Sequence, residues 1–195
     1  MHNTTSYHVA QAFLAKNADR LSVQLIKDAQ SQKVELVPQV FEIKKNIKGA
    51  SGAINLIDAT TQKVVGISSF SQNRLETGRA GVVSHISIGY KTDAATGKEG
   101  ALAYTVALPA ALQNATLLIN QNGKEILRLP AIEVSNLTAG QRAADQYTEL
   151  KSLLLLDDNN EIELKLEFPT GVAMPTDAEQ YIYLRMSGFQ TVRKS

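Results

Sequence analysis

Few residues in this chain have the chemistry of a catalytic or metal site. Histidine is a common acid–base catalyst, and the chain has three: His2, His8 and His85. His85 lies in the apolar run VVSHISI, which predicts a strand, and no other ligand follows it at the spacing of a zinc motif such as HExxH. We therefore expect His85 to be a strand histidine bonded to a neighbour, with no metal-binding or catalytic role.

Carboxylates gather in one segment of the C-terminal half: Asp157, Asp158, Glu161, Glu163 and Glu167. A calcium-binding EF-hand loop needs oxygen ligands at fixed positions around a central glycine, and this run does not match that pattern. We interpret it as a polar turn followed by the solvated face of a strand. The segment TGKEG at 96–100 also lacks the first glycine of a phosphate-binding loop, because position 92 is a threonine.

Composition restricts the remaining classes of site. The chain has 195 residues, a net charge of +1 and no cysteine, so disulfides and thiolate chemistry are excluded. The weak basic groups at 44–48 and 193–194 are not interleaved with aromatic residues, so we expect no specific recognition of nucleic acid. No apolar run approaches the roughly 20 residues that cross a bilayer. We therefore expect no transmembrane segment, secretory signal, metal, cofactor or small-molecule ligand.

The strongest structural signal is LLLLDDNNEIELKLEF at 153–168, because its second half alternates with a period of two. The residues of the predicted dry face are Ile162, Leu164, Leu166 and Phe168. The residues of the predicted wet face are Glu161, Glu163, Lys165 and Glu167. This pattern indicates a strand with one buried face in a β-sandwich or barrel.

Turn signals and apolar runs predict further strands along the chain. Asn122-Gly123 lies between two apolar runs, a pattern typical of a two-residue hairpin turn. Other runs rich in strand-forming residues occupy 34–45, 53–58, 63–70, 82–90, 101–108 and 181–189.

Helical spacing of apolar residues is confined to two segments. Residues 5–31 form a loose stripe, and 138–153 predict a short helix inserted between strands. We therefore divide the chain into a helical or extended arm at 1–33 and a β-sandwich domain at 34–195. Because the sandwich closes its own core, we expect residues 1–30 to pack on a partner subunit more than on this chain. The fold predicted is a single jelly-roll-like sandwich or barrel of about eight to ten antiparallel strands.

This layout resembles jelly-roll capsid proteins of viruses, particularly those of small tailless bacteriophages. Three segments carry the resemblance: ATLLINQNGKEILRLPAIEV, EIELKLEFPTGVAMPT and YIYLRMSGFQTVRK. It covers Val34 to Lys194 in architecture, and it brings no functional residues with it. It implies a virion structural protein, assembled in the host cytoplasm, which binds copies of itself and other virion proteins and is not an enzyme.

Two other functions stay open from the sequence. A β-sandwich module that binds a glycan or a protein needs an exposed aromatic platform, which six tyrosines could supply: Tyr7, Tyr90, Tyr104, Tyr147, Tyr181 and Tyr183. An enzyme on a β-scaffold needs a pocket in which His85 meets a carboxylate such as Glu76 or Asp93.

Overall fold

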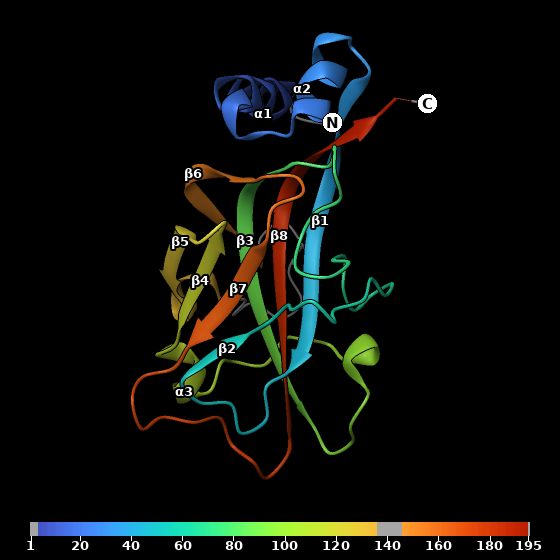
Figure 1. The fold of residues 1–195 in the computed structure, drawn as a ribbon. Helices are drawn as coiled ribbons and strands as arrows, with labels where there is room; N and C mark the ends of the chain where they lie inside the picture. The colour runs from blue at the N-terminus through green and yellow to red at the C-terminus, as the bar shows by residue number, and fades with distance from the viewer. Residues whose placement is uncertain (1–3, 136–145, 195) are drawn as a thin grey trace.

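Two antiparallel β-sheets face each other, and short helices cover one end of the pair (Figure 1). The structure is a computed structural model and describes residues 4–135 and 146–194. Eight strands in this part of the chain form two four-stranded sheets. The strands are β1 (Val34–Asn46), β2 (Ala53–Asn55), β3 (Gly81–Asp93), β4 (Thr116–Gln121), β5 (Lys124–Pro130), β6 (Thr148–Leu156), β7 (Ile162–Glu167) and β8 (Glu179–Arg193). The helices are α1 (Thr4–Lys16), α2 (Val23–Gln30) and α3 (Ala110–Gln113), with 3₁₀ turns η1 (Ala18–Arg20), η2 (Glu99–Ala101) and η3 (Ala131–Val134).

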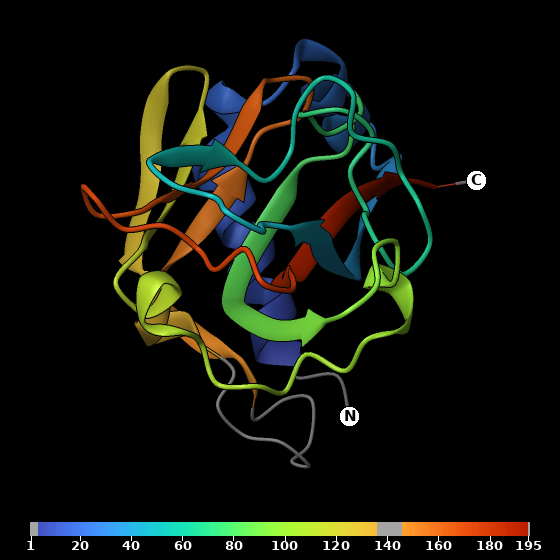
Figure 2. The ribbon, with the colours of Figure 1, turned by 90° about the horizontal axis from the view of Figure 1, so that it is seen from below.

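The strand order is that of a jelly roll. One sheet, here called the long sheet, has the order β1-β8-β3-β6, and the other, the short sheet, has the order β2-β7-β4-β5. The chain folds back on itself at the β4–β5 hairpin, so that β3 pairs with β6, β2 with β7 and β1 with β8. Figure 2 shows the two layers from below. Two interleaved Greek keys of this kind define the jelly roll, so the predicted fold class is confirmed.

The alternating run at 162–168 lies in the core as predicted. All four apolar residues of its dry face are buried: Ile162, Leu164, Leu166 and Phe168. On the opposite face Glu161 is exposed, whereas Glu163 and Lys165 are only half-exposed and form an ion pair at 2.7 Å. The prediction of the dry face is confirmed. On the predicted wet face, the side chain of Glu161 is more exposed than those of Glu163 and Lys165.

The predicted Asn122-Gly123 turn is confirmed. It joins β4 to β5, and both residues have positive φ, 53° for Asn122 and 73° for Gly123. Positive φ at both central positions is the type I′ geometry, whose twist matches that of the flanking strands.

Three predicted elements are wrong. Residues 63–70 form no named strand; instead they lie beside β1, where the Lys44 amide donates to the Ile67 carbonyl at 2.8 Å. Residues 101–108 contain the end of η2 and irregular chain rather than a strand. The helix predicted at 138–153 is in its last part the strand β6, and residues 138–145 lie outside the described residues. Packing against the sheets, and not local pattern, sets the structure of these apolar runs.

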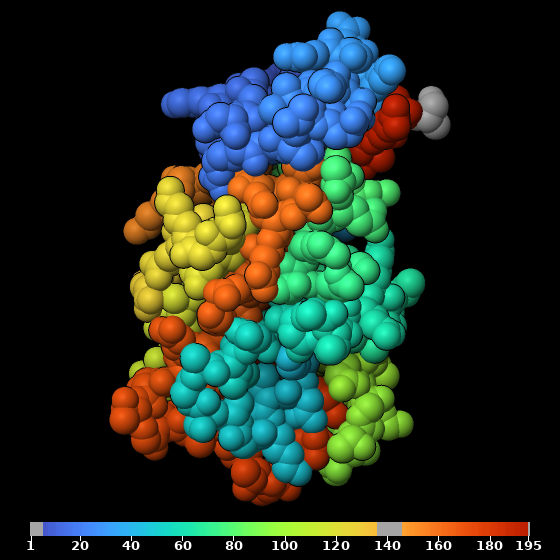
Figure 3. Space-filling model, in the orientation of Figure 1, coloured from blue at the N-terminus to red at the C-terminus, as the bar shows by residue number. Residues whose placement is uncertain are grey.

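The N-terminal helices pack on their own chain, where we expected them to pack more on a partner subunit. Ala10, Leu14 and Leu25 are buried in a small cluster with Val82 of β3 and Leu155 of β6. Val82 and Leu155 lie on the outer face of the long sheet, since their neighbours along each strand point into the main core. The arm therefore covers one end of the sandwich (Figure 3).

Two carboxylates hold this arm in place. Asp157 forms an ion pair with Arg20 at 3.0 Å. Asp158 accepts hydrogen bonds from the Ser22 amide at 2.9 Å, the Ser22 hydroxyl at 2.5 Å and the Gly78 amide at 2.7 Å. Ser22 also caps α2 by accepting from the Leu25 amide. We call these contacts the carboxylate clasp.

The clasp adds to the interpretation of Asp157 and Asp158 as part of a polar turn, because both side chains are buried in it. Only 6% of Asp157 and 2% of Asp158 is exposed. Burial raises the pKa of Asp157, and the nearby Arg20 opposes this effect. The two carboxylates therefore differ in how their charge is compensated. Asp158 accepts from three donors, whereas for Asp157 the effect of desolvation on the pKa exceeds that of its ion pair with Arg20.

We expect neutral substitutions in the clasp to have unequal effects on unfolding in urea at pH 7. Asp158→Asn turns one acceptor into a donor that faces N–H groups, and should cost about 1–3 kcal/mol. Asp157→Asn removes a desolvated charge, and should change the free energy of unfolding by less than about 1 kcal/mol. A carboxyl whose pKa is raised by folding weakens the fold as the pH rises through that pKa, so the wild type should show this loss and Asp157→Asn should not. Equal costs for the two variants would contradict this account.

We expect Gly123→Val to lower the free energy of unfolding by about 1 kcal/mol or more, because a β-branched residue resists positive φ. Thermal unfolding measures the effect. Lys124→Val, at the exposed first residue of β5, is the matched control and should have a smaller effect. Identical melting temperatures for the two variants would argue against the strained turn.

Candidate functional site

The outer face of the long sheet carries a group of polar residues beyond the helices. Along β8, Ile182, Leu184 and Met186 point into the core, so Tyr183 and Arg185 point outward. Strand pairing places Tyr183 beside Lys44 of β1 and Gly89 of β3. It places Arg185 beside Glu42 of β1 and Ser87 of β3. Antiparallel register therefore gathers these side chains from three strands.

Aromatic rings surround the two cations of this group. The Lys44 ammonium lies 5.3 Å from the ring centroid of Tyr104 and 4.7 Å from that of Tyr183. The Arg185 guanidinium lies 4.8 Å from the ring centroid of Tyr147 and 5.0 Å from that of Tyr183. These are cation–π distances, which stabilise each pair by roughly 0.5–2 kcal/mol. We call these five residues the tyrosine–cation cluster.

Gly89 makes room for the cluster. Residues 102–106 cross the sheet directly above it, and the Val106 amide donates to the Tyr90 carbonyl at 3.2 Å. A Cβ atom at position 89 would lie 2.8 Å from the Tyr104 Cβ and 2.9 Å from the Tyr104 carbonyl oxygen. Only glycine allows this approach, which brings the Tyr104 ring to 5.1 Å from that of Tyr183.

Burial dominates the electrostatics of the cluster. It raises the pKa of Tyr104, Tyr147 and Tyr183 above the ordinary value of a phenol, which is itself neutral at physiological pH. The hydroxyl of Tyr183 donates to the Glu42 carboxylate. Burial lowers the pKa of Lys44, and Glu42 opposes this shift while Arg185 adds to it. The cluster therefore presents desolvated positive charge and neutral hydroxyls, which suits binding better than proton transfer.

Three of the six tyrosines proposed as an aromatic platform thus lie together, and three do not. Tyr90 points into the core and donates to Gln180, and Tyr181 is buried with its hydroxyl bonded to the Ala95 carbonyl at 3.2 Å. Tyr7 lies on α1. No sequence signal marks the two cations, since Lys44 stands in an ordinary basic run and Arg185 in a strand.

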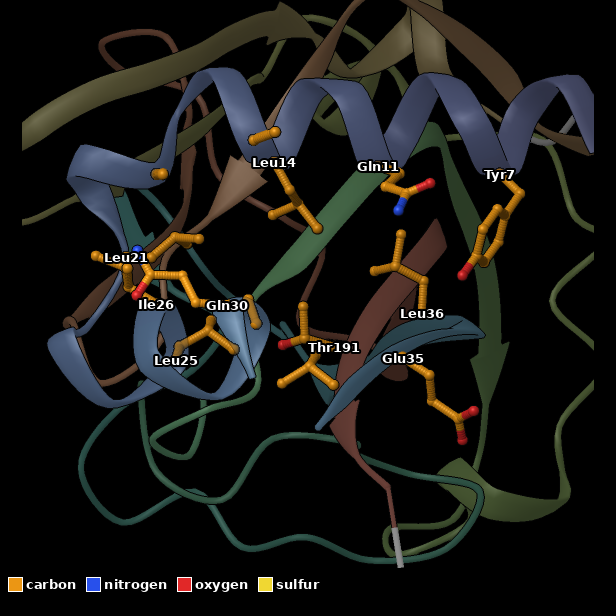
Figure 4. A pocket seen from close by; sticks show the side chains of 14 residues that line it. Tyr7, Gln11, Leu14, Leu21, Leu25, Ile26, Gln30, Glu35, Leu36 and Thr191 are labelled. Carbon is orange, nitrogen blue, oxygen red and sulfur yellow. The ribbon is translucent and has the colours of Figure 1, made fainter. Parts of the chain in front are cut away.

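Apart from the cluster, a hollow lies between the N-terminal helices and the strands β1 and β8 (Figure 4). Its volume is about 370 Å³, and most of its lining is apolar. Leu14 and Leu25 come from the helices, Leu21 from the bend between η1 and α2, and Leu36 from β1; Tyr7 lies at one side. This size is in the range of small-ligand pockets, but convergent polar groups are few.

His85 does not meet the carboxylates proposed for it. Its Nδ1 lies 2.8 Å from the Ser84 hydroxyl, and its partner across the strand pair is Glu149. Glu76 forms an ion pair with Arg79 at 3.1 Å, and Asp93 lies at the far end of β3, opposite Glu179. A hollow of about 210 Å³ borders His85. Neither Glu76 nor Asp93 lies beside His85, whereas Glu149 lines the same hollow.

The other charged groups of the sequence form separate contacts. The remaining members of the acidic run are each paired: Glu161 with Asn73, Glu163 with Lys165 and Glu167 with Arg128. Of the basic group, Lys45 pairs with Asp58 and Lys48 with Glu179, which leaves Lys44 alone in the cluster. Within residues 4–135 and 146–194, no three histidines or carboxylates come together as a metal site.

We expect Gly89→Ala to displace Tyr104 and to lower the free energy of unfolding by about 1–3 kcal/mol, because the added Cβ has no space. Since the chain has no tryptophan, near-ultraviolet circular dichroism reports its tyrosines and phenylalanines and should show the disturbed ring packing. Gly100→Ala is the control, since its Cβ would lie 3.8 Å from Ile67, an ordinary contact. A Gly89→Ala spectrum and stability like those of the wild type would refute the close approach.

Comparison with known proteins assigns no family to this arrangement. No protein-family model matches the sequence, and no curated protein is similar to it. None of the described helices is both long and apolar enough to span a membrane. The function is therefore argued from the fold and from the surfaces described above.

Proposed function

We propose that this protein is a shell subunit, a virion structural protein of a tailless bacteriophage that assembles with copies of itself and with other virion proteins. The strand order β1-β8-β3-β6 and β2-β7-β4-β5 carries the proposal. The jelly roll is the architecture of many viral capsid proteins, although other functions use it as well. The proposal is therefore supported by topology and needs a surface through which subunits meet.

Exposed apolar side chains along β1 provide such a surface. Val40 of β1 is 39% exposed, and Val64 and Val65, in the segment beside β1, are 43% and 101% exposed. The backbone of β1 is already occupied there, since the Ser69 amide donates to the Glu42 carbonyl at 2.9 Å. A neighbouring subunit would therefore bind through side chains and not by adding a strand. We call Val40, Val64 and Val65 the valine edge.

The chemistry of the described residues supports a non-enzymatic role. His85 has a hydroxyl neighbour but lacks Glu76 and Asp93, and the tyrosine–cation cluster has neutral phenols. The binding-module alternative keeps one observation in its favour, which is the gathering of Tyr104, Tyr147 and Tyr183 on one sheet face.

Size-exclusion chromatography with light scattering, followed by electron microscopy, tests the shell proposal. We expect the full chain to form a closed assembly, and Val65→Asp to reduce it to small species by placing a charge in an apolar contact. Val23→Asp is the matched control, since Val23 is 67% exposed on α2 away from the valine edge, and it should assemble. A full chain that stays monomeric at high concentration would overturn the proposal. Assembly that is insensitive to Val65→Asp would move the contact elsewhere.

A further inference from the structure

The tyrosine–cation cluster contains more positive charge than its surroundings compensate. Within the described residues, neither Lys44 nor Arg185 forms an ion pair with a carboxylate. The charge of Glu42 acts on Lys44, but the Glu42 carboxylate already accepts a hydrogen bond from the Tyr183 hydroxyl. Two cations and one carboxylate leave a net charge of about +1 in a partly desolvated place.

Hydrogen-bond donors in the cluster are also unused. The Nη2 atom of Arg185 donates to the Ser87 hydroxyl at 3.1 Å and to the Gln146 side-chain oxygen at 3.2 Å. Its Nε is buried and has no hydrogen-bond partner among the described residues. No hydrogen bond from the Lys44 ammonium is formed in the same part of the chain; the ammonium lies over rings. An ammonium has three donors and a guanidinium has five, so several N–H groups remain to be satisfied.

The rings fix the positions of these donors. Both cations lie within 5.0 Å of the centroid of Tyr183, one from β1 and one from β8 itself. Tyr104 and Tyr147 contact them from two loops on the far sides. Low-dielectric walls strengthen an interaction with negative charge, and held side chains lose less entropy on binding.

We propose that the tyrosine–cation cluster binds an oxyanion, a carboxylate or phosphate group of a small ligand, through Lys44 and Arg185. An oxygen of either group accepts from a guanidinium N–H or an ammonium N–H, and the two cations neutralise its charge. This departs from the expectation, drawn from the sequence, that the protein has no small-molecule ligand. It does not depend on the shell proposal, because the cluster lies on the outer sheet face and needs no second subunit.

Two other kinds of partner fit the cluster less well. A neutral sugar needs a free ring face for stacking, but the ring of Tyr183 is contacted by Lys44 and Arg185. A nucleic acid usually needs several phosphate contacts, and two cations would supply only weak, salt-dependent binding. The positive charges and the free donors therefore both favour a ligand with a single anionic group.

Titration of the full chain with sodium phosphate, and separately with glutarate, tests the site. Sodium chloride at equal ionic strength is the reference, and tyrosine fluorescence and calorimetry are the measurements, since the chain has six tyrosines and no tryptophan. We expect saturable binding of at least one of the two anions. Binding of phosphate alone assigns a phosphate ligand, and binding of glutarate alone a carboxylate ligand. Responses to both anions that equal the response to chloride would overturn the proposal.

Variants of the cluster make the test specific. Lys44→Gln and Arg185→Gln should each weaken binding by about tenfold or more, because each removes charged donors. Lys45→Gln is the control, since the neighbouring Lys45 pairs with Asp58 outside the cluster, and it should bind like the wild type. Glu42→Gln should instead strengthen binding, because it removes the competing negative charge and keeps an acceptor for Tyr183. Thermal unfolding shows whether each variant folds. If Lys44→Gln and Arg185→Gln do not fold, the affinity of Glu42→Gln for the anion still tests the site. Unchanged affinity in Glu42→Gln together with unchanged affinity in Lys44→Gln would refute the site.

Discussion

The structure depends on the pairing of β8 with both β1 and β3. This strand is 15 residues long and lies inside the long sheet, with hydrogen-bonded neighbours along both edges. Its inward residues, such as Leu184, fill the core, and its outward residues Tyr183 and Arg185 form the centre of the tyrosine–cation cluster. Near its end, Phe189 meets the N-terminal helices. Because side chains alternate along a strand, a slip of one residue would exchange the core with the cluster and remove the seat of the helices.

Local sequence was sufficient where a single segment decides its own structure. Asn122-Gly123 needs only its own backbone freedom to make the turn, and the run at 162–168 needs only one buried face. The jelly-roll-like fold class followed from the number and spacing of such segments. In contrast, 63–70 and 101–108 are rich in strand-forming residues but form no named strand, and only some of their apolar side chains, such as Phe70 and Leu108, are buried. Periodicity cannot separate these two cases.

Contacts between distant parts of the chain were not visible in the sequence. The sequence predicts a polar turn at Asp157 and Asp158 because their neighbours are polar, yet their partners Arg20 and Ser22 precede them by 137 and 136 residues. The tyrosine–cation cluster likewise joins β1, β8 and two loops, and nothing near Lys44 in the sequence points to Arg185. Three of its tyrosines were named only as members of a set of six. Which of them gather is decided by strand register and by the space above Gly89.

The buried carboxylates beside the N-terminal helices and the two cations of the tyrosine–cation cluster have different kinds of partner, and this difference bears on function. At the helical end, the carboxylates of Asp157 and Asp158 are met by donors from the same chain, so their burial is explained by the attachment of the arm. In the cluster, Lys44 and Arg185 are met, among the described residues, by ring faces and neutral acceptors. Removing a cation from water without a counter-charge costs free energy, and cation–π contacts return only part of it. In the proposed site, an anion from outside would supply the ion pair that Lys44 and Arg185 do not form among the described residues. The outer face of the long sheet would then bind an anion, a role separate from that of the valine edge.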